Sequence, residues 1–220
     1  MQLSVVRGWP VLLSFAWRRR MWSDYWRSFG RLLLDSGAFS AYRSGTPIDL
    51  SAYADWADSF NACPDAVAGL DDIGGDWRQS MKNYTRFARG FPTYHDTDPP
   101  ELLPELVAMS RERGRWLGLG VKPRHAHDAR VHARTWLMRT LIQIPPDIQV
   151  HGWALRKHLD LSRLDSVDST SWFRKFSDWK NKYPWLTNFE CVELSIKHIQ
   201  RSPKLDRHTP DDHQPMLFSD

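Results

Sequence analysis

The sequence predicts an α/β fold in which strands of a parallel sheet alternate with helices. Short apolar runs with little alternation recur along the chain, as in strands that are buried on both faces. Helical patterns lie between these runs, and acidic or other polar residues follow the runs directly. Such a sheet forms either a (β/α)₈ barrel or an open doubly wound sheet. No GxGxxG motif follows an early strand, which disfavours a dinucleotide-binding fold.

Seven apolar runs are predicted to be strands, and an eighth strand is possible. In chain order they cover residues 11–16, 31–36, 66–71, 91–95, 116–121, 148–153 and 164–168, with the possible eighth at 189–192. The helical patterns cover residues 49–60, 76–88, 99–113, 126–144 and 171–182. Asp49 can cap the first of these helices, whereas Gly114 and the Pro145-Pro146 pair end later ones.

Length and composition indicate one globular domain. Of the 220 residues, 41% are hydrophobic and 25% are charged, so residues 1–200 are expected to form a single domain. Residues 201–220 are rich in Pro, Asp and His and are expected to be a poorly ordered tail. No apolar run is long enough to span a membrane. Two cysteines without disulfide or zinc spacing favour a reducing, cytoplasmic location.

Polar residues and glycines gather at the carboxyl ends of the predicted strands. In a parallel barrel these ends meet on one face, where such folds carry their chemistry. The residues are therefore expected to gather on this face: Ser14, Asp35, Asp71 with Asp72, His95 with Asp96, Gly118, Gly120, His151 with Gly152, and Asp168.

Asp35 and Asp168 are the candidate catalytic residues. Displacement at a sugar anomeric carbon passes through an oxocarbenium-like state. One carboxylate can attack or stabilise that carbon while another group handles the proton. The pair therefore predicts an enzyme that acts on a glycosidic centre. The alternative, for either acid alone, is that it caps the turn or helix that follows it.

A planar base is the expected ligand. Backbone N–H groups around Ser36 and Gly37 could hold its polar edge, and Phe39 could stack on its ring. Asp71 could accept hydrogen bonds from an amino-purine. His95 could contact the ligand or carry a proton, and His151 could form the pocket floor. Alternatively, Phe39 packs in the core and the histidines are structural.

Basic residues near this face suggest a nucleic-acid partner. The net charge is +4 and the chain contains twelve Trp, which could stack on bases. Residues that could contact a phosphate backbone are Lys122, Arg124, Arg130 and Arg156. The alternative is that they lie on solvated helix faces. The histidines at 125, 127 and 132 match no zinc pattern, so neither a metal nor a cofactor is expected.

Six segments together form a recognisable pattern: Asp35-Ser36-Gly37-Ala38-Phe39-Ser40, Leu70-Asp71, Tyr94-His95, Leu117-Gly118-Leu119-Gly120, Val150-His151-Gly152 and Val167-Asp168-Ser169-Thr170-Ser171-Trp172. The pattern resembles the tRNA-guanine transglycosylase superfamily. It is closest to the short branch from phages and genomic islands, which includes DpdA-like DNA transglycosylases. The resemblance spans roughly residues 11–172 and implies a (β/α)₈ barrel.

The resemblance also implies roles for individual residues. Asp168 matches the nucleophile that attacks C1′ and expels guanine, and Asp35 matches the acid that assists proton transfer. Phe39 matches the aromatic residue that stacks on the base, and Asp71 matches the acid that reads its edge. The segment from Gly118 to Gly120 matches the strand beneath the base.

Three departures from the tRNA enzymes qualify the resemblance. His95 stands where those enzymes usually have Gln, and His151 where they often have Met. Those enzymes also hold a zinc ion with three Cys and one His near the C-terminus, where this chain has only Cys191. The resemblance therefore implies a compact barrel without the zinc subdomain, and it favours DNA over tRNA.

The implied activity is exchange of guanine in DNA for a 7-deazaguanine such as preQ0. The implied partners are DNA, the 7-deazapurine base and possible DNA-modification proteins. A tRNA substrate, a nucleoside hydrolase of small molecules and an inactive nucleic-acid-binding barrel remain as alternatives.

Overall fold

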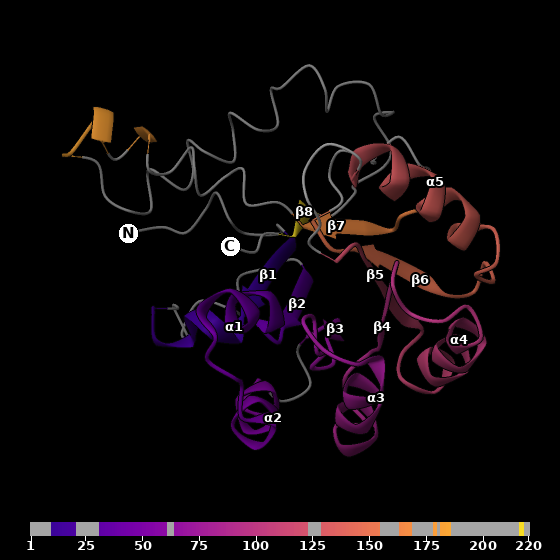
Figure 1. The fold of residues 1–220 in the computed structure, drawn as a ribbon. Helices are drawn as coiled ribbons and strands as arrows, with labels where there is room; N and C mark the ends of the chain where they lie inside the picture. The colour runs from indigo at the N-terminus through magenta and orange to yellow at the C-terminus, as the bar shows by residue number, and fades with distance from the viewer. Residues whose placement is uncertain are drawn as a thin grey trace.

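The structure is a computed structural model that describes residues 10–20, 31–60, 64–122, 129–154, 163–168, 178–179, 181–185 and 216–217. Over these residues the fold is α/β, with helices placed between strands along the chain (Figure 1). Every pair of neighbouring strands in the described part is parallel. The predicted fold class is therefore confirmed at this level.

The strands form two parallel sheets whose order follows the chain. The first sheet contains β1 (Pro10–Ser14), β2 (Arg31–Asp35) and β3 (Ala66–Val67). The second contains β4 (Thr93–His95), β5 (Trp116–Gly120), β6 (Gln149–Gly152), β7 (Ser166–Asp168) and β8 (Met216–Leu217). An isolated parallel bridge between Ala68 and Phe91 joins the sheets, and β1 also contacts β8.

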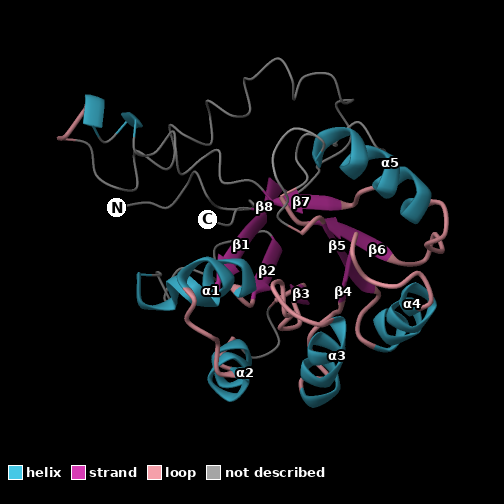
Figure 2. Ribbon diagram, viewed as in Figure 1, coloured by secondary structure: helices cyan, strands magenta, loops and turns pink. Residues whose placement is uncertain are grey.

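The helices follow one another around the outside of the strands (Figure 2). They are the 3₁₀ helix η1 (Phe15–Arg20), α1 (Ala38–Ser44), α2 (Leu50–Asp58), α3 (Trp77–Arg86), α4 (Leu102–Glu112) and α5 (Ala129–Leu141). Asp49 caps α2 as predicted, because its carboxylate accepts the Ser51 amide at 2.7 Å. Asp76 caps α3 in the same way. No described helix has the length and apolar character needed to cross a membrane.

The structure differs from the predicted elements at α1 and β8, and two further predictions fall largely outside the described residues. Helix α1 was not expected, and it begins directly after the Asp35-Ser36-Gly37 segment. The possible strand at 189–192 lies outside the described residues, as does most of the helix expected at 171–182. The strand that pairs with β7 is β8, which lies within the stretch expected to be a tail.

Two apolar layers pack the strands against the helices. In the first sheet Leu32, Leu34 and Val67 join a cluster with α1 and α2. In the second sheet Leu117 and Leu119 join a cluster with α4 and α5. Since apolar side chains also cover the opposite face, these strands are buried on both sides and carry uninterrupted apolar runs.

A third cluster lies on the strand face that points away from these layers, which we call the inner face. It is defined by Leu12, Leu33, Ala66, Phe91 and Trp116, with Trp153 packed against it. These residues come from both sheets, so the inner face is shared between them. Because side chains alternate along a strand, the same alternation carries Ser14, Asp35, Thr93, His95, Gly118 and Gly120 onto this face.

Candidate active site

Three aspartates meet at the carboxyl ends of the strands. Strand β2 ends at Asp35, strand β7 ends at Asp168, and Asp71 follows β3. The charges of Asp71 and Asp168 both act on the Asp35 carboxyl group. The structure therefore brings together the two predicted catalytic acids and the predicted base-reading acid.

Asp35 has an unusual protonation equilibrium. Burial raises the pKa of Asp35 to about 7, opposed by hydrogen bonds from the Ser14 side chain and the Gly37 backbone and assisted by the charges of Asp71 and Asp168. Ser14 is its register partner on β1. Both forms of Asp35 are therefore populated near neutral pH, as a group that donates and then accepts a proton requires.

Asp168 is held by the turn that follows β6. Its side chain is buried, and Oδ1 accepts a hydrogen bond from the backbone N–H of Ala154. Ala154 has a φ of 55°, an uncommon conformation for a residue with a side chain. Such outliers persist where the surroundings impose them and often occur at functional sites. The turn therefore combines an uncommon backbone conformation with an amide that points at the candidate nucleophile.

His151 lies beside Asp168 and is fully buried. Its Nε2 is 3.9 Å from Asp168 Oδ1, and its Nδ1 is 2.7 Å from Ser166 Oγ. Burial lowers the pKa of His151 to about 3, so the ring is neutral. Among the described residues Nε2 has no hydrogen-bond partner.

The carboxylate of Asp168 determines which tautomer of His151 is favoured. A lone pair on Nε2 would face the negative charge of Asp168, whereas an Nε2–H group would be attracted to it. We therefore infer that Nε2 carries the proton and that the Ser166 hydroxyl donates to Nδ1. The Nε2–H group of His151 thus faces the Asp168 carboxylate and attracts its negative charge. It does not form an open pocket floor, because Trp153 packs edge-on against its ring with centroids 4.2 Å apart.

His95 lies between two carboxylates. Its Nε2 is 3.0 Å from Asp71 Oδ2, and its Nδ1 is 3.6 Å from Asp98 Oδ2. Burial acts to lower the pKa of His95, but the hydrogen bonds and charges of Asp71 and Asp98 outweigh burial and raise it to about 9. His95 is therefore an imidazolium at neutral pH.

The residues after Asp35 have mainly local roles, apart from Phe39. Ser36 is buried, and its Oγ accepts the Ala38 amide at 3.4 Å where α1 begins. Gly37 has a φ of 76°, and a Cβ there would lie 2.9 Å from Ala16. Phe39 is 43% exposed on α1, so its ring is accessible for stacking.

Side chains of the protein lie close to the glycines of β5. A Cβ on Gly118 would lie 2.4 Å from Trp153 Nε1, which itself donates to Thr93 Oγ1 at 3.0 Å. A Cβ on Gly120 would lie 2.9 Å from the His95 ring. Gly152 is the buried last residue of β6. Gly118 and Gly120 therefore make room for Trp153 and His95.

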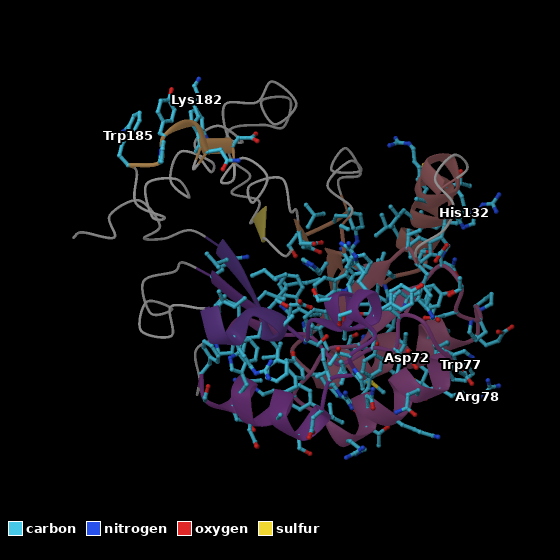
Figure 3. All side chains as sticks on the ribbon, turned by 60° about the vertical axis from the view of Figure 1, so that its left-hand side comes forward. Asp72, Trp77, Arg78, His132, Lys182 and Trp185 are labelled. Atoms are coloured by element: carbon cyan, nitrogen blue, oxygen red, sulfur yellow. The ribbon has the colours of Figure 1, made fainter. Side chains whose placement is uncertain are left out.

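A cavity of about 570 Å³ adjoins Asp71. It lies between α1, the start of α2, the β3–α3 loop and α3, and its lining includes Tyr42, Ile48, Asp71, Asp72 and Asn83. Figure 3 shows Asp72 in the loop just before Trp77, the first residue of α3. Asp35, His95 and Asp168 do not line this cavity. A ligand in it would reach the base-reading acid from the side of α1.

Only one of the predicted nucleic-acid contacts is described with its side chain. Lys122 Nζ donates to the Gly75 carbonyl at 3.3 Å, and the Lys122 amide donates to Asp96 Oδ1 at 2.9 Å. The other Asp96 oxygen lies 3.2 Å from Nε2 of His132, which Figure 3 shows on α5. Arg124, Arg156 and the side chain of Arg130 lie outside the described residues. No metal-binding group of three or more His, Cys, Asp or Glu residues occurs in the described part.

Sequence reasoning missed several members of the site. Asp98 could have been found, because it lies three residues after His95 in a turn that leads into Pro99-Pro100. Ser166 and Ala154 had no such signal, because their contacts depend on how β6 and β7 align. Ser14, in contrast, was among the polar residues expected at the strand ends, and the strand register places it beside Asp35.

Comparison with known proteins adds no identification. No protein-family model, curated protein or solved structure matches the chain. Its function is therefore inferred from the geometry of this site together with the sequence resemblance.

Proposed function

We propose that the protein is a guanine transglycosylase that exchanges guanine in DNA for a 7-deazaguanine through a covalent intermediate on Asp168. The supporting observation is the cluster of Asp35, Asp71 and Asp168 at one end of the strands, in which Asp35 has a pKa of about 7. Two acids with different tasks need environments that separate their protonation states. Such an arrangement suits displacement at an anomeric carbon.

The proposed reaction has two displacements. An Asp168 oxygen forms a bond to C1′ while the bond from C1′ to guanine N9 breaks, and protonated Asp35 supplies the proton that the leaving base needs. The incoming base then loses its N9 proton to the Asp35 carboxylate and attacks C1′, which releases Asp168. Atoms and charge balance over the cycle, and Asp35 returns to its starting form.

Each neighbour of these acids has a task in this scheme. The Ala154 amide and the His151 ring orient Asp168 for attack. Asp71 accepts hydrogen bonds from the base edge, and exposed Phe39 stacks on a base. A target guanine in duplex DNA must be extruded from the stack, because C1′ and the base edge are otherwise hidden. The net charge of +4 favours binding of a polyanion.

We also propose that the two sheets are parts of one (β/α)₈ barrel. The Ala68–Phe91 bridge joins them on one side, and the contact of β1 with β8 joins them on the other. The inner face draws residues from both sheets, as the inside of a barrel does. A barrel would place all of the strand ends on one face and so accounts for the cluster of acids.

The decisive experiment is incorporation of labelled guanine into duplex DNA and into unmodified tRNA, measured side by side. Asp168→Asn removes the nucleophile, and Asp147→Asn removes an exposed acid that pairs with Arg111 at 3.1 Å. We expect label in DNA only, lost with Asp168→Asn and kept with Asp147→Asn. A complex of protein and DNA that survives denaturation should form with the unaltered protein and with Asp147→Asn, but not with Asp168→Asn.

The other outcomes point to different functions. Label in tRNA alone would assign the same chemistry to RNA. Release of guanine without incorporation of label would indicate a hydrolase. Full activity of Asp168→Asn would overturn the nucleophile assignment, and inactivity of the unaltered protein on both polymers would argue for a binding role.

A further inference from the structure

We propose that Trp179, Lys182, Tyr183 and Trp185 form a surface that binds single-stranded DNA by stacking on an unpaired base and attracting the neighbouring phosphate. We call these four residues the stacking surface. Its role goes beyond base exchange, because it holds the strand and takes no part in the displacement at C1′. The inference rests on the proposed function only in taking DNA as the polymer.

A helical turn brings the rings of Trp179 and Tyr183 together. The two residues are four positions apart, so one turn of helix places them on the same face. The backbone N–H of Tyr183 donates to the Trp179 carbonyl at 2.8 Å, as in such a turn. The rings stack with their centroids 5.8 Å apart and their planes 17° apart. Pro184 follows and cannot continue the helix, because it lacks an N–H group.

Trp185 adds a third ring beyond the proline. It meets the Tyr183 ring edge-on, with centroids 5.4 Å apart and planes at 69°. Trp185 is nevertheless 75% exposed, and Figure 3 shows it projecting away from the ribbon. Of the tryptophans whose side chains the structure describes, it alone is exposed. The two rings behind it therefore support an indole that is still accessible to a ligand.

Positive charge accompanies these rings. Lys182 is exposed, and its Nζ lies 5.3 Å from the centroid of the Tyr183 ring. Figure 3 shows Lys182 projecting from the same segment as Trp185. In the sequence, the stretch from 172 to 185 contains four Lys or Arg residues and a single acidic one, Asp178. A stretch of this composition attracts a polyanion.

An unpaired base next to a phosphate fits both features. Proteins that bind single strands combine aromatic side chains, on which bases stack, with cations that follow the phosphates. In a duplex the faces of each base are covered by the neighbouring base pairs, so Trp185 could not reach them. Base exchange requires the target base to leave the stack, and a strand opened in this way presents unpaired bases.

A membrane surface fits these observations less well. A helix that lies on a membrane buries a whole face of apolar side chains. Among residues 178–179 and 181–185, Trp185 is the one large apolar side chain that is exposed. A single supported ring beside a lysine matches a base and its phosphate better than it matches a layer of lipid.

The test compares strands that have bases with strands that lack them. Fluorescence anisotropy measures the affinity for a labelled single-stranded DNA, for an abasic strand of the same length, for the duplex, and for RNA of the same sequence. The variants are Trp185→Ala, Trp185→Phe and Lys182→Gln. The matched controls are Ile142→Ala, at an 84% exposed apolar residue just after α5, and Lys82→Gln, at an exposed lysine of α3.

We expect Trp185→Ala to weaken binding of single-stranded DNA about tenfold, as loss of one stacked base does, and to leave binding of the abasic strand unchanged. Trp185→Phe keeps an aromatic ring and should retain most of the affinity. Lys182→Gln should weaken binding of both strands and reduce the salt dependence by about 0.7 in the logarithmic slope, which corresponds to one phosphate contact. Ile142→Ala and Lys82→Gln should match the unaltered protein.

Several results would overturn the inference. They are no binding of single-stranded DNA by the unaltered protein, or an equal loss on both strands in Trp185→Ala. Tighter binding of the duplex or of the RNA would reject single-stranded DNA as the ligand. Binding to phosphatidylglycerol vesicles that depends on Trp185 and is not displaced by single-stranded DNA would assign the surface to a membrane.

The outcome is separable from that of the proposed function. Binding of single-stranded DNA that depends on Trp185, without any exchange of guanine, would support the stacking surface and reject the transglycosylase. Exchange of guanine in DNA, with an affinity for single strands that Trp185→Ala leaves unchanged, would support the transglycosylase and reject the stacking surface.

Discussion

Burial acts in opposite directions on Asp35 and His151. It raises the pKa of Asp35 to about 7 and lowers the pKa of His151 to about 3. Folding therefore favours protonated Asp35, which costs stability as pH rises from about 4 to 7. Folding also favours neutral His151, which costs stability as pH falls from about 6.5 to 3. The buried Asp35 charge therefore lowers the free energy of unfolding at neutral and higher pH, and the buried His151 ring lowers it in acid.

Asp35→Asn should be more stable than the unaltered protein at pH 8. The neutral amide removes the cost of burying a charge at this position. At pH values above the pKa of Asp35, this cost is on the order of 2–4 kcal/mol. The difference should shrink toward pH 4.5, where Asp35 is protonated in the folded protein. Urea unfolding at the two pH values measures it. The same gain at both values would show that Asp35 ionises normally, and the variant should have lost base exchange.

His151→Gln should reduce the acid sensitivity of the fold. The unaltered protein must bind a proton at His151 when it unfolds below pH 6.5, so its stability falls in that range. The variant lacks this contribution, and its free energy of unfolding should change less between pH 6.5 and 4.5. His132→Gln, at a 43% exposed side chain on α5, is the control. Equal slopes for the unaltered protein and His151→Gln would contradict the assignment.

At the scale of elements, helix α1 depends on one glycine. Gly37 has a left-handed backbone and lies tightly against Ala16 of η1, so both conformation and space exclude a side chain. Gly45, just past the end of α1, is also left-handed, but nothing lies within 4 Å of the position a Cβ would take. A comparison of substitutions at Gly37 and Gly45 therefore separates the energetic cost of the backbone conformation from the cost of the steric clash.

Gly37→Ala should therefore cost more stability than Gly45→Ala. The left-handed conformation alone costs about 1–2 kcal/mol, and this is all that Gly45→Ala should lose. Gly37→Ala should lose roughly 1–3 kcal/mol more, because the clash must be relieved by moving backbone atoms of η1. Urea unfolding of both variants tests this. Equal losses would place the constraint on backbone conformation alone.

Two aspartates close the amino ends of the sheets in the same way. Asp65 Oδ2 accepts the Leu32 amide at 2.7 Å, and Asp165 Oδ2 accepts the Val150 amide at 2.7 Å. In each case the aspartate's own amide also donates to the carbonyl of the same partner residue. Two hydrogen bonds therefore join the neighbouring strands at this point.

Asp65→Ala should destabilise the fold by about 1–3 kcal/mol, because it leaves a strand amide without its acceptor. Asp147→Ala removes an exposed ion pair with Arg111 and should cost at most about 1 kcal/mol. Thermal unfolding compares the two variants. A loss from Asp65→Ala no larger than that from Asp147→Ala would mean that solvent replaces the carboxylate.

At the scale of the whole molecule, β8 decides whether the strand end that carries Asp168 has a neighbour. Leu217 pairs with Asp168 itself, and β8 contacts β1. A chain that ends before Met216 would leave β7 as an edge strand and open the contact between the two sheets.

Truncation before Met216 should lower the free energy of unfolding and abolish base exchange, because it disturbs the alignment of Asp168 with Asp35. Removal of the last three residues, 218–220, is the control and should change neither property. Urea unfolding and the exchange assay measure both. Unchanged stability and activity of the chain ending before Met216 would agree with the expectation that residues 201–220 are a poorly ordered tail.

Local sequence patterns predicted most of the strands and helices, but they missed two short elements. Apolar runs and capping residues predicted seven strands and the helices α2 to α5, because these signals are read within a few residues. They also placed Asp35, His95 and Asp168 at strand ends. They missed α1, because it consists of seven residues and begins after Gly37 without a side-chain cap. They also missed β8, because a two-residue strand has no periodicity.

The sequence by itself determined that this is an α/β chain with acids at the ends of its strands, since those features follow from local periodicity. Only the tertiary structure decided that the Ala154 amide holds Asp168 beside His151, that Asp98 reaches Asp71 through His95, and that Asp35 has a pKa near 7. The physical reason is that hydrogen-bond partners and protonation states depend on strand register and burial. These arise only when distant segments pack together.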